Sequence, residues 1–419
     1  MTALKGLLGE IAEQANLYDS TERAIVVAQR RRRLTRIAPV AAALALVVGV
    51  GGVWLPLRPD SDTAVLGPAP TADWLPRTLE LPRADPPPLP TDRGVAPASL
   101  SYIPANPPDS TGEILVTEDG KQYTVIPRAD KRTHIGGISP DGRWLVTVRN
   151  GYEVQLRDLT GTDERVVARI EGVGEVKWSS DGRWLAIHVA RTSVGPDATE
   201  PGNEQVINRA LLIDMSSGDR RELSISNSPD TVITAVLPSG DLVVRDITEG
   251  SIVEARVLDQ AGHQRRRIAV DVRAKLTAAE RQPQTADHVN VEQTLLPDGH
   301  TLLVRTYRER AATNGQPFMI PVPDDVLAID LDSAVVTRRY AMPDPDPVQP
   351  NIDGLSDTAC DCRAAAGPLP GGMLFFHNGR QGTGGPTALE LLDLSTGQLR
   401  VVTTIAGPVF LIGAIRVSN

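Results

Sequence analysis

The sequence predicts an all-β fold, a six-bladed β-propeller, preceded by a short helical segment and one transmembrane helix. The first observation is a turn that recurs about forty residues apart: residues 139–145 read Ser-Pro-Asp-Gly-Arg-Trp-Leu and residues 180–185 read Ser-Asp-Gly-Arg-Trp-Leu. Weaker copies begin at Leu237, Leu296 and Leu369. Self-similarity at this period is typical of propellers and solenoids. The second observation is another turn within each repeat, and the third is a long uncharged run near the N-terminus.

The chemistry of the recurring turn predicts a β-hairpin. Proline presets φ at the first central position of a turn, aspartate is tolerated there, and glycine adopts the φ > 0 position that closes it. The apolar run that follows is short, as expected for a buried strand. Neighbouring residues such as Trp144 and Leu145 point to opposite faces of a strand, and both are apolar. We therefore expect each strand to be covered on both faces, as in stacked blades.

The second turn lies between two apolar runs and has an Asp-x-x-Gly or Asp-x-x-x-Gly pattern in four of its five copies. It occurs at residues 157–161, 213–218, 258–262, 329–333 and 392–397. Two hairpins per repeat give four strands, which is the unit of a propeller blade. We place five such units at about residues 134–172, 173–225, 230–268, 291–342 and 365–405. Joining the remaining segments Gly112–Arg128 and Val409–Val417 into one blade closes a ring of six, with seven blades as the alternative.

The Ser-Pro-Asp-Gly-Arg-Trp-Leu pattern resembles the WD-repeat-like propeller repeats of the TolB type. The resemblance covers roughly residues 112–419 and is best at Ser139–Leu145 and Ser180–Leu185. It implies a propeller, often of six blades, that acts mostly as an interaction platform. The family has no fixed catalytic set, so the resemblance implies no specific activity.

Composition excludes several classes of protein. The chain has 419 residues with a formal net charge of −9, which argues against a nucleic-acid-binding surface. Its two cysteines, Cys360 and Cys362, exclude a disulfide scaffold and a multi-cysteine zinc site. They could form a strained disulfide in an oxidising compartment, or remain two loop thiols.

Residues 1–36 read as short cytoplasmic helices. Apolar residues fall on one helical face, and Asp19 with Glu22 has the spacing of a capping box. One reading is a juxtamembrane helix; the other is a docking helix, because the segment resembles the tails of actinobacterial anti-sigma-like membrane proteins. A zinc-binding anti-sigma domain needs a His and Cys cluster here, yet the first histidine is His134.

Residues 37–57 have no charge and are long enough to cross about 30 Å of hydrocarbon as a helix. Five arginines, Arg30, Arg31, Arg32, Arg33 and Arg36, precede the run, and only Arg58 follows it directly. Arginines are retained on the cytoplasmic side, so we expect a single-pass anchor in the cell membrane with a cytoplasmic N-terminus and an extracytoplasmic propeller. A cleavable signal peptide is the alternative, but no Ala-x-Ala site follows the run closely.

Residues 58–111 are expected to form a linker, with residues 112–419 forming the propeller. Thirteen prolines fall within residues 58–108. Such segments favour extended polyproline II at roughly 3.1 Å per residue, so the linker could hold the propeller on the order of 100 Å from the membrane. We expect this spacer to contribute nothing to the core.

The sequence contains no motif that predicts catalysis. Its six histidines have no metal-ligand spacing, and there is no H-E-x-x-H, G-x-S-x-G or P-loop pattern. Five aspartates between Asp344 and Asp361 could in principle bind calcium, although their spacing matches no known loop. We therefore expect no catalytic residue, cofactor or metal. A hydrolase or lyase acting in the propeller funnel is an alternative.

The prediction for function is a membrane-anchored, non-catalytic binding or sensing platform. The alternative is a transmembrane regulator that signals through residues 1–36. Short turns emerge on one rim of the propeller, and long insertions such as Arg191–Gln205 and Tyr307–Pro323 emerge on the other. Long loops on a rigid scaffold usually bind partners. We expect a protein or cell-wall partner, not nucleic acid, to contact Arg191, Tyr307, Arg308 and Arg310 on this rim.

Overall fold

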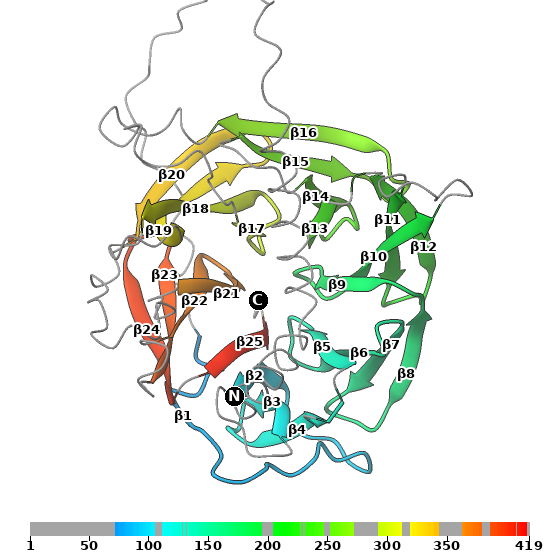
Figure 1. Cartoon of the computed structure of the whole chain (residues 1–419), viewed down its shortest axis with the longest axis vertical. Coiled ribbons are helices and arrows are strands. Elements are labelled where there is room, and N and C mark those ends of the chain that lie inside the picture. The colour runs from blue at the N-terminus through cyan, green and yellow to red at the C-terminus, as the bar shows by residue number, and fades with distance from the viewer. Residues whose placement is uncertain are drawn as a thin grey trace, which may run out of the picture. The chain divides into compact units, whose positions relative to one another are not determined.

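The computed structural model contains six β-sheets arranged around one axis (Figure 1). It describes residues 72–104, 111–127, 129–130, 132–194, 204–226, 228, 231–246, 252–271, 292–311, 319–342, 363–378, 386–407 and 409–416. Within these ranges the secondary structure is β throughout, with no helix. The prediction of an all-β, six-bladed propeller is confirmed, and the seven-bladed alternative is wrong.

Four blades are regular antiparallel sheets of four consecutive strands. The second blade contains β5 (Thr133–Ile138), β6 (Trp144–Arg149), β7 (Glu153–Asp158) and β8 (Glu164–Arg169). The third contains β9 (Val173–Trp178), β10 (Trp184–Val194), β11 (Glu204–Asp214) and β12 (Arg220–Ser226). The fourth contains β13 (Thr231–Val236), β14 (Leu242–Asp246), β15 (Ile252–Leu258) and β16 (Gln264–Asp271), and the fifth β17 (Glu292–Leu295), β18 (Thr301–Ala311), β19 (Met319–Asp330) and β20 (Val335–Ala341). In each, the first strand lies nearest the axis (Figure 1).

The first blade joins the two ends of the described chain. Its order is β25-β2-β3-β4, with β25 (Val409–Ile415) innermost and β2 (Ala98–Pro104), β3 (Thr111–Thr117) and β4 (Gln122–Pro127) outside it. The expectation that residues near 112–128 and 409–417 share a blade is confirmed. The expected boundary at residue 112 is wrong, because β2 lies within the segment expected to be a spacer.

The sixth blade receives a fifth strand from the same N-terminal segment. It contains β21 (Arg363–Leu369), β22 (Gly372–Asn378), β23 (Thr387–Asp393) and β24 (Leu399–Ala406), and β1 (Thr78–Glu80) pairs with β24 in parallel. Further along, the backbone N–H of Leu89 donates to the carbonyl of Thr124 in the first blade at 3.1 Å. The N–H of Val95 donates to the carbonyl of Leu159 in the second blade at 2.6 Å. Residues 72–97, which we call the strap, therefore contact the sixth, first and second blades in turn.

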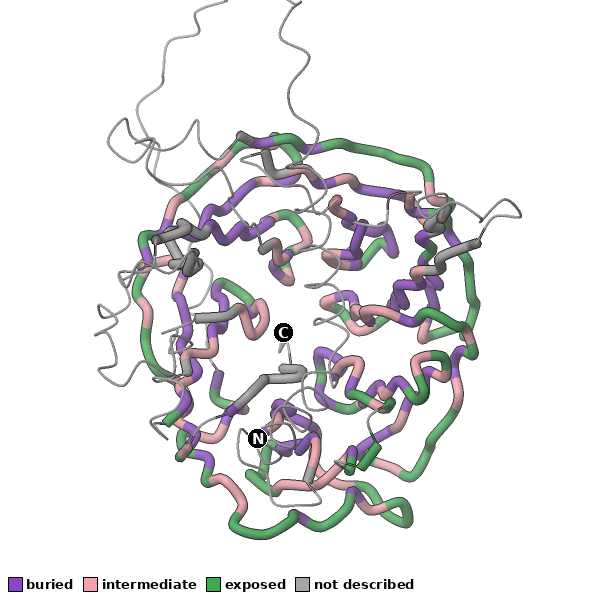
Figure 2. Tube along the Cα trace, in the orientation of Figure 1, coloured by how far each residue is buried: buried purple, intermediate pink, exposed green. Residues whose placement is uncertain are grey.

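The hydrophobic core lies between the blades. Buried apolar residues form six clusters, and each joins two neighbouring blades. Middle strands such as β6 and β14 are buried on both faces, as the apolar pattern predicts, while outer strands such as β12 and β20 are largely exposed (Figure 2). Leu75, Leu79 and Leu89 of the strap are also buried. The strap is thus part of the folded domain.

Several predictions fall on residues that the structure does not describe. These are the helical segment 1–36, the run 37–57, the acidic loop and the pair Cys360 and Cys362. Among the described residues, no helix is long and apolar enough to cross a membrane.

Candidate functional site

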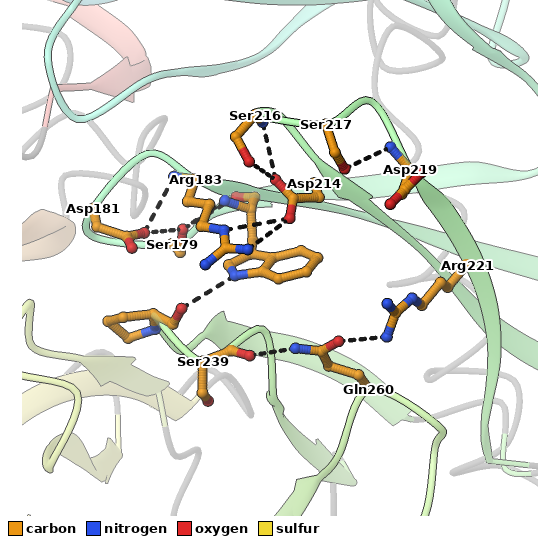
Figure 3. Close-up of polar contacts among 12 residues, drawn as sticks. Ser179, Asp181, Arg183, Asp214, Ser216, Ser217, Asp219, Arg221, Ser239 and Gln260 are labelled. Atoms are coloured by element: carbon orange, nitrogen blue, oxygen red, sulfur yellow. Dashed lines mark hydrogen bonds and ion pairs between the residues drawn. The ribbon is translucent and has the colours of Figure 1, made fainter.

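The rim that holds the short turns is built from a repeated hydrogen-bond motif, and Figure 3 shows the copy in the third blade. In the third blade, the Ser179 hydroxyl donates to Asp181 at 2.6 Å and accepts the N–H of Trp184 at 2.8 Å. The Asp181 carboxylate also accepts the N–H of Arg183 at 3.1 Å. Ser139, Asp141, Arg143 and Trp144 repeat the same bonds in the second blade. The turn therefore satisfies its own polar groups.

The two turns of a blade are joined by an ion pair that sequence reasoning missed. The Arg183 guanidinium donates to one Asp214 oxygen from Nε at 3.3 Å and from Nη2 at 2.9 Å. The other Asp214 oxygen accepts the N–H and hydroxyl of Ser216. Hydrogen bonds from Arg183 and then from Ser216 lower the pKa of Asp214. Arg143 and Asp158 form the equivalent pair in the second blade at 2.6 Å.

Neighbouring blades are cross-linked on this same rim. The Trp184 indole N–H donates to the carbonyl of Pro238 in the fourth blade at 3.1 Å. Gln260 donates to the Ser239 carbonyl and accepts from Arg221 of the third blade (Figure 3). Many polar groups of this rim are therefore committed to contacts within the propeller.

On the opposite rim, the β10–β11 hairpin extends past its blade. The last pair between β9 and β10 is Val173 with Val189, whereas β10 and β11 stay paired to Val194 with Glu204. Residues 190–194 therefore continue for about 16 Å beyond β9, at roughly 3.3 Å per residue. The β11–β12 ladder likewise ends at Asn208 with Ser226.

The β18–β19 hairpin extends in the same direction. β17 pairs with β18 up to Arg305, and β19 pairs with β20 from Asp325, but β18 and β19 stay paired to Ala311 with Met319. Both β10 and β18 begin at an Asp-Gly turn, so both hairpins leave from the rim opposite those turns. They flank the fourth blade (Figure 1). We call this the hairpin rim.

The four predicted contact residues all lie on these two hairpins. Arg191 pairs with Ile207 in the first hairpin. Tyr307, Arg308 and Arg310 pair with Pro323, Val322 and Ile320 in the second. We expected irregular loops at these positions, and this was wrong: the backbone there is paired strand. The structure thus brings three of the residues together on one hairpin and places Arg191 on the other.

A cavity of about 370 Å³ lies along the axis of the propeller. Its walls are formed mainly by the innermost strands β5, β9, β13, β17 and β21, including the small residues Gly136, Gly137 and Ala365. Charge is contributed by Glu175, Lys177 and Arg245, and the first two form an ion pair at 3.5 Å. We call this cavity the channel.

Turns from different blades also line the channel. The Ser180 hydroxyl of the third blade donates to the Pro297 carbonyl of the fifth at 2.9 Å, although the two turns are not neighbours in the ring. The channel volume is within the range of small-ligand pockets. Among the residues described, no group of three or more His, Cys, Asp or Glu side chains could hold a metal ion.

A further ionisable residue that sequence reasoning missed is Glu113 in β3. Its carboxyl is buried between the first and second blades and accepts hydrogen bonds from Ser101 and from the N–H of Ile135. A lone glutamate in the apolar strand Glu-Ile-Leu-Val could have indicated it, since buried carboxylates are rare unless paired.

Comparison with solved structures finds matches at low sequence identity. The chain is similar to an acylaminoacyl peptidase from Pyrococcus horikoshii, at 12% identity and a TM-score of 0.41, over 70% of this chain and 41% of the peptidase. It is similar to an oligogalacturonate lyase in complex with manganese, at 16% identity and a TM-score of 0.40, over 70% of each chain. It is similar to a putative TolB from Agrobacterium tumefaciens, at 14% identity and a TM-score of 0.40, over 78% of this chain and 95% of that protein. No protein-family model matches the chain, and the search of curated proteins gave no significant match. At these identities and TM-scores the likenesses assign no function, and the six-bladed fold is established by the sheet order of this protein.

Proposed function

We propose that this protein is a membrane-anchored binding platform without catalytic activity, whose propeller lies outside the cytoplasmic membrane. The partner, a protein or a cell-wall component, contacts the hairpin rim. The observation that supports this choice of rim most strongly is that two hairpins, β10–β11 and β18–β19, stay paired well beyond their blades on the same side.

The contrast between the two rims supports the proposal. Projecting strand pairs on a rigid scaffold offer backbone and side chains to a partner, in the way binding loops do. On the rim that holds the short turns, many serine, aspartate and arginine side chains instead hydrogen-bond to one another. Arg191 and Tyr307 come from hairpins on either side of the fourth blade, so a partner that contacts both must bridge that blade.

The membrane attachment rests on sequence. The uncharged run 37–57, with five arginines on one flank, predicts a single-pass anchor with the N-terminus inside. The strap begins at the described residue 72 and contacts three blades, so the anchor would be joined to the propeller by a short segment.

Shortening the hairpins tests the proposal. In one variant residues 191–207 are replaced by a two-residue turn, and in another residues 307–323 are replaced in the same way. Crosslinking in intact cells should give an adduct with the full-length protein that both variants lose. A Ser217→Ala variant, altered at an exposed turn of the other rim, should keep it. Retention of the adduct by both shortened proteins, or its loss only in Ser217→Ala, would contradict the proposal.

A further inference from the structure

Glu113 lies at the boundary between the first and second blades, which we call the seam. The residue is 5% exposed. One carboxyl oxygen accepts the Ser101 hydroxyl of β2 at 2.9 Å, and the other accepts the N–H of Ile135 in β5 at 3.0 Å. A single side chain therefore bonds its own blade and the innermost strand of the next blade.

The position of Ile135 explains why a side chain is needed there. β5 is the innermost strand of its blade, so one of its edges has no strand partner within that blade. A register shift follows Ile135 in its pairing with β6. Buried backbone N–H groups need an acceptor, and Glu113 supplies one across the seam.

Among the described residues, the Glu113 carboxyl is hydrogen-bonded only by neutral groups, the Ser101 hydroxyl and the Ile135 backbone N–H. The titratable residues adjacent in sequence to its two partners are Tyr102, next to Ser101, and His134, next to Ile135; the Tyr102 hydroxyl donates to Gln122. Burial raises the pKa of Glu113 to about 7, and the hydrogen bonds from Ile135 and Ser101 oppose this in part.

We propose that Glu113 makes this seam a pH-responsive latch, in which the neutral acid holds the first two blades together and the ionised form loosens them. The neutral acid buries no charge, and its carbonyl can still accept the N–H of Ile135. The ionised form keeps two hydrogen bonds but buries a charge among Leu115, Ile126 and Ile135. The latch adds a regulated opening to the fold and does not depend on the proposed partner.

The direction of the pH effect follows from linkage. In the unfolded or opened chain the carboxyl titrates near 4.5, and in the closed seam near 7. The closed seam therefore binds the proton more tightly, so its stability is full below pH 4.5 and falls as pH rises to about 7. The equilibrium between closed and open seam should shift by at least about tenfold over this window.

Hydrogen exchange of the full-length protein in mild detergent tests the latch. After correction for intrinsic exchange rates, protection of Thr133–Ile138 should fall by about tenfold or more between pH 5 and pH 8. Glu113→Gln should remove this dependence, because its amide can donate to Ser101 and accept from Ile135 at every pH. Glu222→Gln, a change at an exposed ion pair with Arg209, should behave like the wild type.

A second variant separates a latch from a merely structural contact. Ser101→Ala keeps the carboxyl but removes a hydrogen bond that lowers its pKa. The loss of protection should therefore move to higher pH, and this measurement decides the matter if Glu113→Gln does not fold. Equal pH dependence in wild type and Glu113→Gln would overturn the proposal, as would a shift to lower pH in Ser101→Ala.

Discussion

Gly142 and Gly182 occupy the same position of the repeated turn but have different surroundings. Their φ angles are 73° and 72°, which favours glycine at both. A Cβ on Gly142 would lie 2.5 Å from the carbonyl oxygen of Ala98, whereas the nearest atom to a Cβ on Gly182 is Pro140 Cδ at 3.7 Å. The difference arises because β2 packs beside the turn of the second blade.

This comparison gives a matched pair of substitutions. Gly182→Ala introduces only backbone strain and should lower the free energy of unfolding by about 1 kcal/mol. Gly142→Ala adds a clash with backbone, so it should cost clearly more. Denaturant unfolding of both variants measures the difference, and equal losses would show that β2 does not pack there.

The ion pair between Arg183 and Asp214 predicts that the stability of the protein falls at acidic pH. Hydrogen bonds from Arg183 and Ser216 lower the pKa of Asp214 from 3.8, so the stability it contributes is present above pH 3.8 and is lost as pH falls through the lower folded value. Asp214→Asn should melt below the wild type at pH 7, and the gap should narrow below pH 4. Thermal melts at several pH values check this; a gap that stays constant down to pH 2.5 would count against the pair.

Residue patterns predicted each turn but not the contacts between turns. Proline, aspartate and glycine act locally, so residues 139–145 and 180–185 were sufficient to predict hairpins. The pairing of Arg183 with Asp214 joins residues 31 apart, and nothing in either turn alone indicates the other as its partner. Glu113 was missed for the same reason, because its partner Ile135 belongs to another blade.

At the scale of elements, the strap is the main difference between the sequence prediction and the structure. Prolines indicated a spacer, yet the carbonyl groups of Pro86 and Pro87 accept hydrogen bonds from Thr124. Proline has no backbone N–H, so neither residue has a donor that would need an acceptor. A segment at a sheet edge can therefore be rich in proline and still be bound. Leucines between the prolines, Leu75, Leu79 and Leu89, provide the buried surface.

The strap should contribute measurably to stability. Leu79 is 3% exposed and lies in β1, so Leu79→Ala should lower the free energy of unfolding by about 2–4 kcal/mol. Val401→Ala, at a 56% exposed position of the neighbouring strand β24, is the matched control and should change it little. Denaturant unfolding compares the two; similar small effects would mean that the strap is not packed on the sixth blade.

The whole ring is closed by both ends of the described chain. β25 completes the first blade from the inside, and β1 extends the sixth blade from the outside. Arg416 links these parts: its guanidinium donates to the Pro140 carbonyl at 3.1 Å, pairs with Glu118 and lies over the Trp74 ring. The repeated turns predicted five blades, and joining the two remaining segments predicted the sixth. The outer closure by β1 was not predictable, because β1 is three residues long and has no repeat counterpart.

The proposed topology makes a prediction at this scale. With residues 37–57 as an uncleaved anchor, protease added to intact spheroplasts should remove the propeller and leave residues 1–36 protected. The arginines before the run set this orientation. An antibody to an N-terminal tag follows the protected fragment. Natural release of the propeller by a cut near residue 57 would contradict the anchor.

Photocrosslinking from single positions tests most directly the claim that the hairpin rim binds the partner. A photoreactive amino acid is placed at Arg191 or Tyr307 on the hairpin rim, or at Ser217 on the exposed turn of the third blade, in the full-length protein in its own membrane. We predict the same adduct from Arg191 and Tyr307 and none from Ser217. An adduct from Ser217, with none from the two hairpins, would contradict the account.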